Sequence, residues 1–235
     1  MQSLTFQEVR RGVQALSSLY VERRTAIGKG TALDGAGKRA AFACFYAPLH
    51  FLLIREIIRA LDAGARRLST IIDLGCGSGV GAAAWALEAN PRPRILGIDR
   101  NAWALQEARW TYSFFGLRNS VRIQDLNTFR LPEKAALIAA FALNELSDDE
   151  RDRLRQSFIS SAGHGSPVLI VEAISRRSAP WWSEWAEPWL AAGGSDMEWR
   201  FRVPLPGPLA LLDKASGLNH SELTGRSLWL SGERP

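Results

Sequence analysis

One short segment constrains the fold of this chain more than any other. Ile71 and Ile72 lead into the run Asp73-Leu74-Gly75-Cys76-Gly77-Ser78-Gly79. An apolar run that ends in an acid and alternating glycines is typical of a buried parallel strand that turns directly into a helix. The glycines let a ligand approach the backbone, and the helix expected from Val80 to Ala89 directs free N–H groups to the same place. The segment therefore predicts a nucleoside-cofactor site in an α/β fold.

The charge of Asp73 distinguishes two kinds of cofactor. A dinucleotide would place its pyrophosphate over the glycines, where a fixed carboxylate opposes it by roughly several kcal/mol at low dielectric. S-adenosylmethionine has no phosphate: its ammonium suits an acid, and its carboxylate suits a helix N-terminus. The spacing Gly77-x-Gly79-x-x-Ala82 also fits a dinucleotide fingerprint, so NAD stays as the lower-ranked alternative.

A second acid, Asp99, ends the short apolar run at residues 94–99. A carboxylate at that strand end can accept both ribose hydroxyls. The helix expected from 102 to 115 begins beside it, and we expect Arg100 and Trp103 to line the adenine pocket. Residues 121–126 read as a third strand. Asp125, near the end of this strand, is expected to accept a hydrogen bond from the exocyclic amine of adenine.

Three phrases, residues 73–79, 97–109 and 124–126, resemble class I S-adenosylmethionine-dependent methyltransferases in order and spacing. The resemblance covers residues 66 to about 175. It implies S-adenosylmethionine as cofactor and a Rossmann-like, doubly wound, mostly parallel seven-stranded sheet with an N-terminal helical extension. The expected cofactor-binding residues are Asp73, Gly75, Cys76, Gly77, Gly79, Asp99, Arg100, Trp103, Asp125 and Leu126.

The chain of 235 residues is long enough for one such domain with an extension. We expect an N-terminal helical extension or cap over 1–65 and the methyltransferase domain over 66–235, with a Trp- and Pro-rich insertion at 176–208. Trp181, Trp185 and Trp189 within that span share a helical face. They indicate a lid over the substrate pocket, a surface that stacks nucleobases or, as we favour, a packing stripe.

Charge is concentrated near the N-terminus. Residues 1–40 contain seven basic and three acidic side chains, whereas the whole chain has a net charge of +5. This basic extension is either an RNA-binding arm or, as we favour, a solvated helical face. Its basic residues are Arg10, Arg11, Arg23, Arg24, Lys29, Lys38 and Arg39.

Methyl transfer requires little from the protein beyond alignment and exclusion of water, so the sequence seldom identifies a catalytic base. The fourth expected strand covers residues 134–141. The segment that follows it lies where substrate would meet cofactor. Asn144 and Glu145 are its candidate catalytic residues, although Ser147 and the acids after it also read as a helix start.

No metal and no membrane contact are expected. Cys44 and Cys76 lie far apart, and His50, His164 and His220 are scattered, so we expect each histidine to have a structural or surface role. No apolar stretch is expected to reach membrane-spanning length, and we expect a cytoplasmic protein. The sequence leaves the oligomeric state open.

Three other segments, 46–51, 141–146 and 169–172, are similar to bacterial relatives of the methyltransferase-like factors of the mitochondrial small ribosomal subunit, without that family's cysteine cluster. Two hypotheses therefore stay open. The first is an active methyltransferase that acts on a small molecule or RNA. The second is an S-adenosylmethionine-binding assembly factor of the ribosome or RNA with little transfer activity.

Overall fold

A seven-stranded sheet with the order β3-β2-β1-β4-β5-β7-β6 organises the protein. The computed structural model describes residues 4–22, 33–132, 134–175, 177 and 179–232. Strands β1 to β5 are parallel, and β7 pairs antiparallel with both β5 and β6. The strands are β1 (Thr70–Leu74), β2 (Arg94–Asp99), β3 (Asn119–Ile123), β4 (Ala136–Ala140), β5 (Val168–Glu172), β6 (Ser195–Phe201) and β7 (Leu223–Leu230). The Rossmann-like, doubly wound fold expected from the sequence is thus confirmed.

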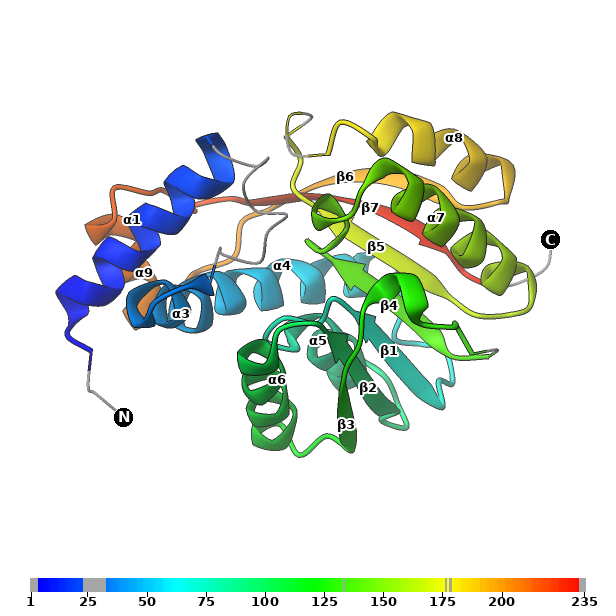
Figure 1. Cartoon of the computed structure of the whole chain (residues 1–235), viewed down its shortest axis with the longest axis horizontal. Helices are drawn as coiled ribbons and strands as arrows, with labels where there is room; N and C mark the ends of the chain where they lie inside the picture. The colour runs from blue at the N-terminus through cyan, green and yellow to red at the C-terminus, as the bar shows by residue number, and fades with distance from the viewer. Residues whose placement is uncertain (1–3, 23–32, 133, 176, 178, 233–235) are drawn as a thin grey trace.

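Helices cover both faces of the sheet (Figure 1), as expected when crossovers join parallel strands. One face packs against α4 (Ala47–Ala60), α5 (Val80–Glu88) and α6 (Ala102–Phe114). The other face packs against α7 (Asp148–Gly163) and α8 (Trp182–Ala191). Short 3-10 turns η3 (Leu126–Thr128) and η4 (Leu143–Glu145) follow β3 and β4. This three-layer arrangement buries the sheet and leaves its carboxyl edge for a ligand.

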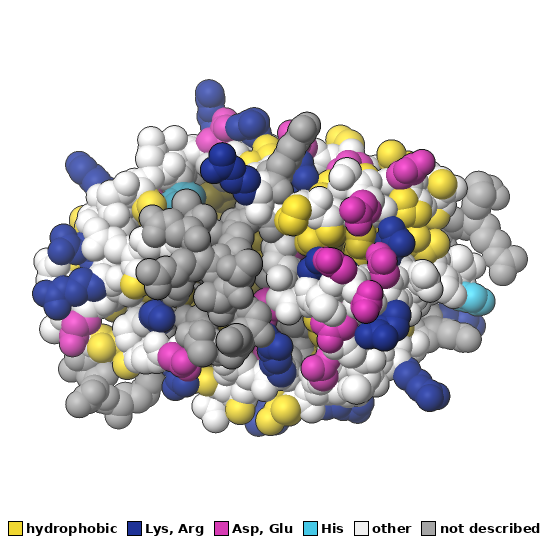
Figure 2. All heavy atoms as spheres, turned by 45° about the horizontal axis from the view of Figure 1, so that its top comes forward, with side chains coloured by type: hydrophobic (Ala, Val, Ile, Leu, Met, Phe, Trp, Pro, Cys, Tyr) yellow, Lys and Arg dark blue, Asp and Glu magenta, His cyan; other side chains and the backbone are white. Residues whose placement is uncertain are grey.

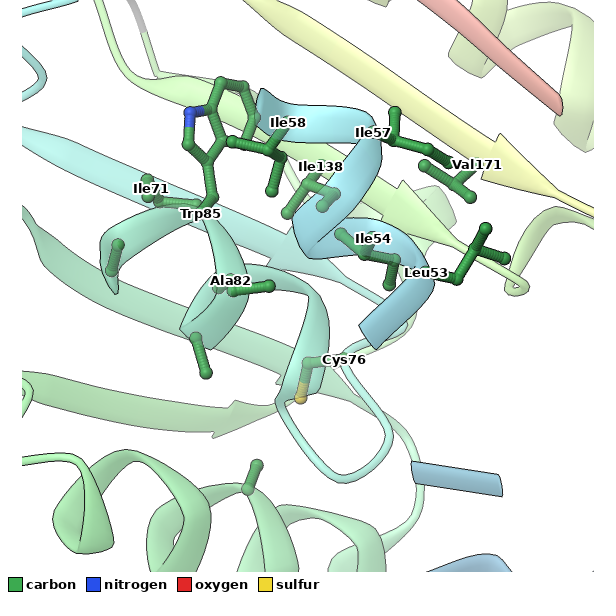
Figure 3. Packing of buried hydrophobic residues seen from close by; sticks show 14 of the residues in the cluster. Leu53, Ile54, Ile57, Ile58, Ile71, Cys76, Ala82, Trp85, Ile138 and Val171 are labelled. Atoms are coloured by element: carbon green, nitrogen blue, oxygen red, sulfur yellow. The ribbon is translucent and has the colours of Figure 1, made fainter. Parts of the chain in front are cut away.

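The first core lies between α4, α5 and the sheet (Figure 3). Ile54, Ile57 and Ile58 of α4 are fully buried there, and so is Trp85 of α5. The indole N–H of Trp85 donates to the Ala63 carbonyl at 3.0 Å. This contact satisfies the single polar atom of the ring and ties the end of α4 to α5.

The tryptophan-rich span forms the second core. Trp185 and Trp189 of α8 stack at 6.1 Å between ring centroids and contact Phe158 of α7 edge to face. All three side chains are at most 1% exposed. The packing interpretation of the stripe is therefore confirmed for Trp185 and Trp189. Moreover, β6 makes residues 195–201 a strand of the sheet, so this part of 176–208 is not an insertion.

The N-terminal segment consists of α1 (Phe6–Glu22), α3 (Ala36–Ala41), the π-helix η2 (Phe42–Tyr46) and α4. Gly12 of α1 lies so close to α3 that an added Cβ would stand 2.2 Å from the Gly37 carbonyl oxygen. Val13 and Leu16 of α1 are fully buried. Because α4 belongs to the first core, the expected boundary at residue 65 does not separate two packing units.

Helices α3, η2 and α4 are continuous from Ala36 to Ala60. By length and composition this helix could cross a membrane, which contradicts the expectation that no apolar stretch is long enough. Its apolar residues include the side chains of α4 that contact α5 and the sheet in Figure 3. Core packing therefore accounts for its composition.

Candidate functional site

A cavity of about 380 Å³ opens at the carboxyl edge of the sheet, within the usual range of small-molecule sites. Its walls come from four places: the helix that contains η2, the turn after β1, the ends of β2 and β3, and the segments after β4 and β5. Eight of the expected cofactor residues line it. They are Asp73, Gly75, Cys76, Gly77, Asp99, Arg100, Asp125 and Leu126.

The turn after β1 has the backbone that the glycine pattern predicted. Gly75, Gly77 and Gly79 all have positive φ, at 67°, 50° and 77°. An added Cβ would stand 2.6 Å from the Ala142 Cβ at Gly75 and 2.7 Å from the Tyr112 ring at Gly79. Conformation and space thus both require glycine at these two positions.

Asp73 lies at the floor of the cavity and is 2% exposed. Its Oδ2 accepts the Ala82 N–H at 2.9 Å and the Tyr112 hydroxyl at 3.4 Å. Burial raises the pKa of Asp73 to about 7, although both hydrogen bonds act in the opposite direction. The carboxyl group therefore stabilises the first turn of α5, a role that the sequence reasoning did not include.

Asp99, at the end of β2, connects three parts of the site. Its Oδ2 accepts the Gly77 N–H at 2.9 Å, and its Oδ1 accepts the Asn101 N–H at 2.8 Å. Asn101 in turn caps α6 by accepting the N–H groups of Trp103 and Ala104. Each carboxylate oxygen has a second lone pair, so Asp99 can still accept hydroxyl groups from the cavity.

The third acid lies after its strand rather than in it. β3 ends at Ile123, three residues earlier than expected, and Asp125 caps η3 by accepting the Asn127 N–H at 2.9 Å. Leu126 follows it in the cavity wall. The polar and apolar side chains expected at the adenine, Asp125 and Leu126, therefore both lie on this turn.

Two expected cofactor residues are outside the cavity lining. Gly79 ends the turn against the Tyr112 ring and acts as the N-cap of α5. Trp103 instead contacts Phe42 edge to face at 6.2 Å and lies 5.4 Å from the Arg39 guanidinium. Trp103 thus turns from the cavity toward the N-terminal helices.

Glu145 and Arg100 form an ion pair at 2.7 Å beside the cavity. Burial raises the pKa of Glu145 and nearby Asp99 adds to this, whereas Arg100 lowers it. The pair joins η4 to the segment after β2, so Arg100 and Glu145, predicted separately for adenine and for catalysis, are partners.

Asn144, itself exposed, is hydrogen-bonded to two buried side chains. Its amide donates to Glu172 Oε2 at 2.8 Å and its carbonyl oxygen accepts the Trp181 indole N–H at 3.0 Å. Glu172, the last residue of β5, is 1% exposed and lines the cavity. Trp181 therefore supports a residue of the cavity wall, unlike the other two tryptophans of its stripe.

The N-terminal helices, expected as a cap over residues 1–65, contribute one wall of the cavity, but the sequence did not identify the residues that line it. Phe42, Tyr46 and His50 line the cavity from η2 and α4, and His50 stacks on Phe141 at 3.9 Å with ring planes 16° apart. Burial lowers the pKa of His50 to about 4. The four-residue spacing of these side chains could have placed them on one helix face, but nothing in the sequence indicated which face meets the sheet edge.

Burial raises the pKa of Tyr46 to about 12, and a hydrogen bond with Ser17 of α1 acts against this shift. The wall is therefore anchored to the first helix. The basic residues Arg23, Arg24 and Lys29 lie outside the described residues. Among the residues that the structure does describe, no group of three His, Cys, Asp or Glu side chains could hold a metal ion.

Comparisons with known proteins agree with this geometry. A methyltransferase-domain family model matches residues 71–161. The carboxy-S-adenosyl-L-methionine synthase of Idiomarina loihiensis is 27% identical over 112 residues, which cover 45% of either chain. This chain therefore aligns with less than half the length of that curated relative.

Solved structures are similar at lower identity. The plantazolicin methyltransferase BpumL, in complex with SAH, is 10% identical with a TM-score of 0.49, over 97% of this chain and 98% of BpumL. The precorrin-6y C5,15-methyltransferase of Geobacter metallireducens is 12% identical with a TM-score of 0.49, over 77% of this chain and 87% of the other. Such values bear on neither substrate nor activity. Residues 71–161 thus match a methyltransferase domain, and the strand order and glycine turn are those expected for the class I S-adenosylmethionine-dependent superfamily.

Proposed function

We propose that the protein transfers a methyl group from S-adenosylmethionine to an acceptor that enters between η2 and the ends of β4 and β5. The observation that carries this proposal is a cavity that extends past the cofactor turn. Beyond the three acids it reaches Tyr46, His50, Phe141 and Glu172. A module that only bound the cofactor would not need this additional lined space.

The residues of the first half fit the cofactor. The N-terminus of α5, with Ser78, Val80 and Gly81 in the cavity wall, offers a positive dipole end to the methionine carboxylate. Asp99 accepts the ribose hydroxyls with its remaining lone pairs, and Asp125 and Leu126 hold the adenine. When bound, the sulfonium supplies an activated methyl group.

The second half of the cavity handles the acceptor. Phe42 and Phe141 present apolar surface that excludes water. His50, stacked on Phe141, has a pKa of about 4 because it is buried, so it is neutral near pH 7 and can accept a hydrogen bond from an acceptor. Asn144, held by Glu172 and Trp181, presents a fixed amide nearby.

The lining of this half admits a planar or apolar group, such as a small molecule or one unstacked base of an RNA. To identify the class, the protein is incubated with cofactor labelled in the methyl group and with separate RNA, protein and metabolite fractions of a cell extract. Label is expected in one fraction. Asp99→Ala, which weakens cofactor binding, should remove it, whereas Asp149→Ala at the exposed start of α7 should not.

The assembly-factor hypothesis predicts a different result. Calorimetry would then show cofactor binding by the wild-type protein, while no fraction would acquire label. That combination would overturn the proposed transfer and leave a binding protein.

A further inference from the structure

The wall of the cavity has more acidic than basic side chains. In the part of the wall that the structure describes, Arg100 is the single Lys or Arg side chain, and Glu145 pairs with it at 2.7 Å. S-adenosylmethionine brings a sulfonium and an ammonium against one carboxylate, so the bound cofactor offsets only part of this difference. The cavity therefore attracts a cation more than an anion. Its acidic side chains are Asp73, Asp99, Asp125, Glu145, Glu150 and Glu172.

Glu172 is the acidic side chain that belongs to the acceptor half. The other five hold the cofactor turn, cap a helix or pair with Arg100. Glu172 ends β5, is 1% exposed, and accepts the Asn144 amide on Oε2 at 2.8 Å. A cation bound beside this buried carboxyl group would favour its ionised form. Glu172 thus gives the acceptor half a fixed hydrogen-bond acceptor that can take a negative charge.

One arginine lies beside Glu172 in the sheet without entering the cavity. Arg226 of β7 is opposite Glu172 in the strand register. Its guanidinium pairs with Glu198 of β6 at 2.9 Å and lies 4.9 Å from the Trp182 ring. Arg226 is not among the described residues of the cavity wall. The row of Glu172, Arg226 and Glu198 contains two acids and one arginine, so Arg226 does not cancel the negative charge of both.

Aromatic side chains line the same half of the cavity. Phe42 and Tyr46 come from η2, and Phe141, after β4, stacks on His50. Phe141 has a φ of 57°, a left-handed conformation that bulky residues rarely adopt. Such strain persists only where the surrounding structure fixes it, often at ligand clamps. The faces of these rings attract cations, and His50, neutral near pH 7 because burial lowers its pKa, can accept a hydrogen bond from an N–H group.

The surface next to the cavity is acidic as well. In Figure 2, acidic side chains gather over α7, whose first turn contains Asp148, Asp149 and Glu150. Glu150 also lines the cavity. The phosphates of an RNA that entered here would face these carboxyl groups, and like charges repel. The acidic turn therefore disfavours RNA as the acceptor.

We propose that the acceptor is a small-molecule amine and that Glu172 selects it, an inference that rests on the proposed methyl transfer. The ammonium form binds beside Glu172 and the rings of Phe42, Tyr46 and Phe141, because a carboxylate and aromatic faces both stabilise an organic cation. A cavity of about 380 Å³ fits such a molecule. The bound ammonium loses one proton to water. The nitrogen lone pair then forms the bond to the methyl carbon, and the C–S bond breaks with its electron pair on sulfur.

A binding test measures this selection without turnover. The full chain is saturated with the demethylated cofactor, and calorimetry compares phenethylamine, phenethyl alcohol and phenylacetate, which are similar in size but cationic, neutral and anionic near pH 7. The amine should bind at least about tenfold more tightly than the alcohol, and phenylacetate should bind most weakly. Equal affinity for the three probes, or no binding of the amine, would overturn the proposal.

Glu172→Gln keeps the shape of the side chain and an oxygen for the Asn144 amide but removes the charge. It should reduce the preference for the amine over the alcohol about tenfold, with the affinities for the alcohol and the demethylated cofactor unchanged. The matched control is Glu187→Gln on the exposed side of α8, which should rank the probes as the wild type does. Circular dichroism melting reports whether each variant folds, and the ranking by the wild type tests the proposal independently of the variants.

A transfer test separates this proposal from the proposed function. The labelling experiment is repeated with a cell extract whose amines are first acetylated by an N-hydroxysuccinimide ester. The metabolite fraction should be labelled before acetylation and not after it. Label that survives acetylation, or label in the RNA fraction, would overturn the amine acceptor while the proposed transfer stands. No label in any fraction, with the three probes ranked as expected, would overturn the transfer alone and leave the selection of amines by Glu172.

Discussion

The backbone N–H of Gly77 donates to the carboxylate of Asp99 at 2.9 Å, which joins the glycine turn after β1 to the end of β2. The residue expected to contact the ribose thus also holds the loop expected to contact the methionine carboxylate. Loss of this one carboxylate therefore affects both ends of the cofactor site.

Asp99→Ala should weaken binding of S-adenosylmethionine and its demethylated product by about tenfold to a hundredfold, because charge-assisted hydrogen bonds contribute roughly 1.5–3 kcal/mol. Isothermal titration calorimetry measures the change, with Asp149→Ala as the exposed acidic control. Unchanged affinity in Asp99→Ala, or preferential binding of NAD, would contradict the cofactor assignment.

His50 should make the protein less stable in acid. Its pKa is about 4 in the folded protein and about 6.5 when unfolded. Between these values the unfolded state holds more protons, so stability falls as the pH decreases from about 6.5 to 4. Between pH 7 and pH 4.5 this effect should lower the free energy of unfolding of the wild type by roughly 2–3 kcal/mol, and His50→Gln should remove it. Urea unfolding at the two pH values measures the difference. The exposed His164→Gln variant should keep the wild-type profile.

Asp73 should change the stability with pH in the opposite direction from His50. Its pKa is about 7 in the folded state and about 3.9 when unfolded, so the folded state holds more protons between these values. Stability from the protonated carboxyl group is then lost as the pH rises from about 4 to 7. Asp73→Asn keeps an oxygen for the Ala82 N–H and should flatten this part of the profile. A profile identical to wild type would show that Asp73 titrates normally.

Gly79→Ala should destabilise the protein by roughly 3 kcal/mol or more, because it combines a positive φ with a Cβ placed 2.7 Å from the Tyr112 ring. Gly116 also has a positive φ, of 63°, but its Cβ would enter open space. Gly116→Ala should therefore cost only about 1 kcal/mol. Denaturant titration of both variants separates the steric cost from the backbone cost.

Trp189→Ala should cost about 3–5 kcal/mol, as expected for a fully buried aromatic side chain. Its neighbour Leu190 on α8 is 52% exposed, and Leu190→Ala should change stability by less than about 0.5 kcal/mol. Similar melting temperatures for the two variants would mean that α8 is a detachable lid rather than part of the core.

The cofactor turn was predictable from the sequence because its determinants are local. Gly75 and Gly77 adopt the backbone that only glycine tolerates well, and Asp99 ends its strand. The direction in which a side chain points from its helix was harder to predict. Trp103 lies between Asn101 and Ala104, which both line the cavity, yet its ring packs on Phe42, because tertiary neighbours decide which face of a helix meets the ligand.

The residues of the acceptor wall were not predictable for a similar reason, although a cap over residues 1–65 was expected. Phe42, Tyr46 and His50 reach the cavity only because α4 packs along α5 and the sheet and brings η2 to the carboxyl edge. Likewise, the period of Trp181, Trp185 and Trp189 identifies a helix face but not its partner. In the structure all three belong to the second core, and Trp181 in addition donates its indole N–H to Asn144.

The π-helix η2 makes the acceptor wall sensitive to chain length. The N–H of Ala47 bonds to the carbonyl of Phe42, five residues earlier, so η2 holds one residue more than an α-helical turn. Deleting Ala43 would restore α-helical spacing and rotate everything before it by roughly 100° relative to α4. Phe42 would then leave the cavity, and α1 would leave its place against Tyr46. The packing of α4 against the sheet would not change. Related chains that differ by one residue here would thus present different entrances above the same cofactor turn.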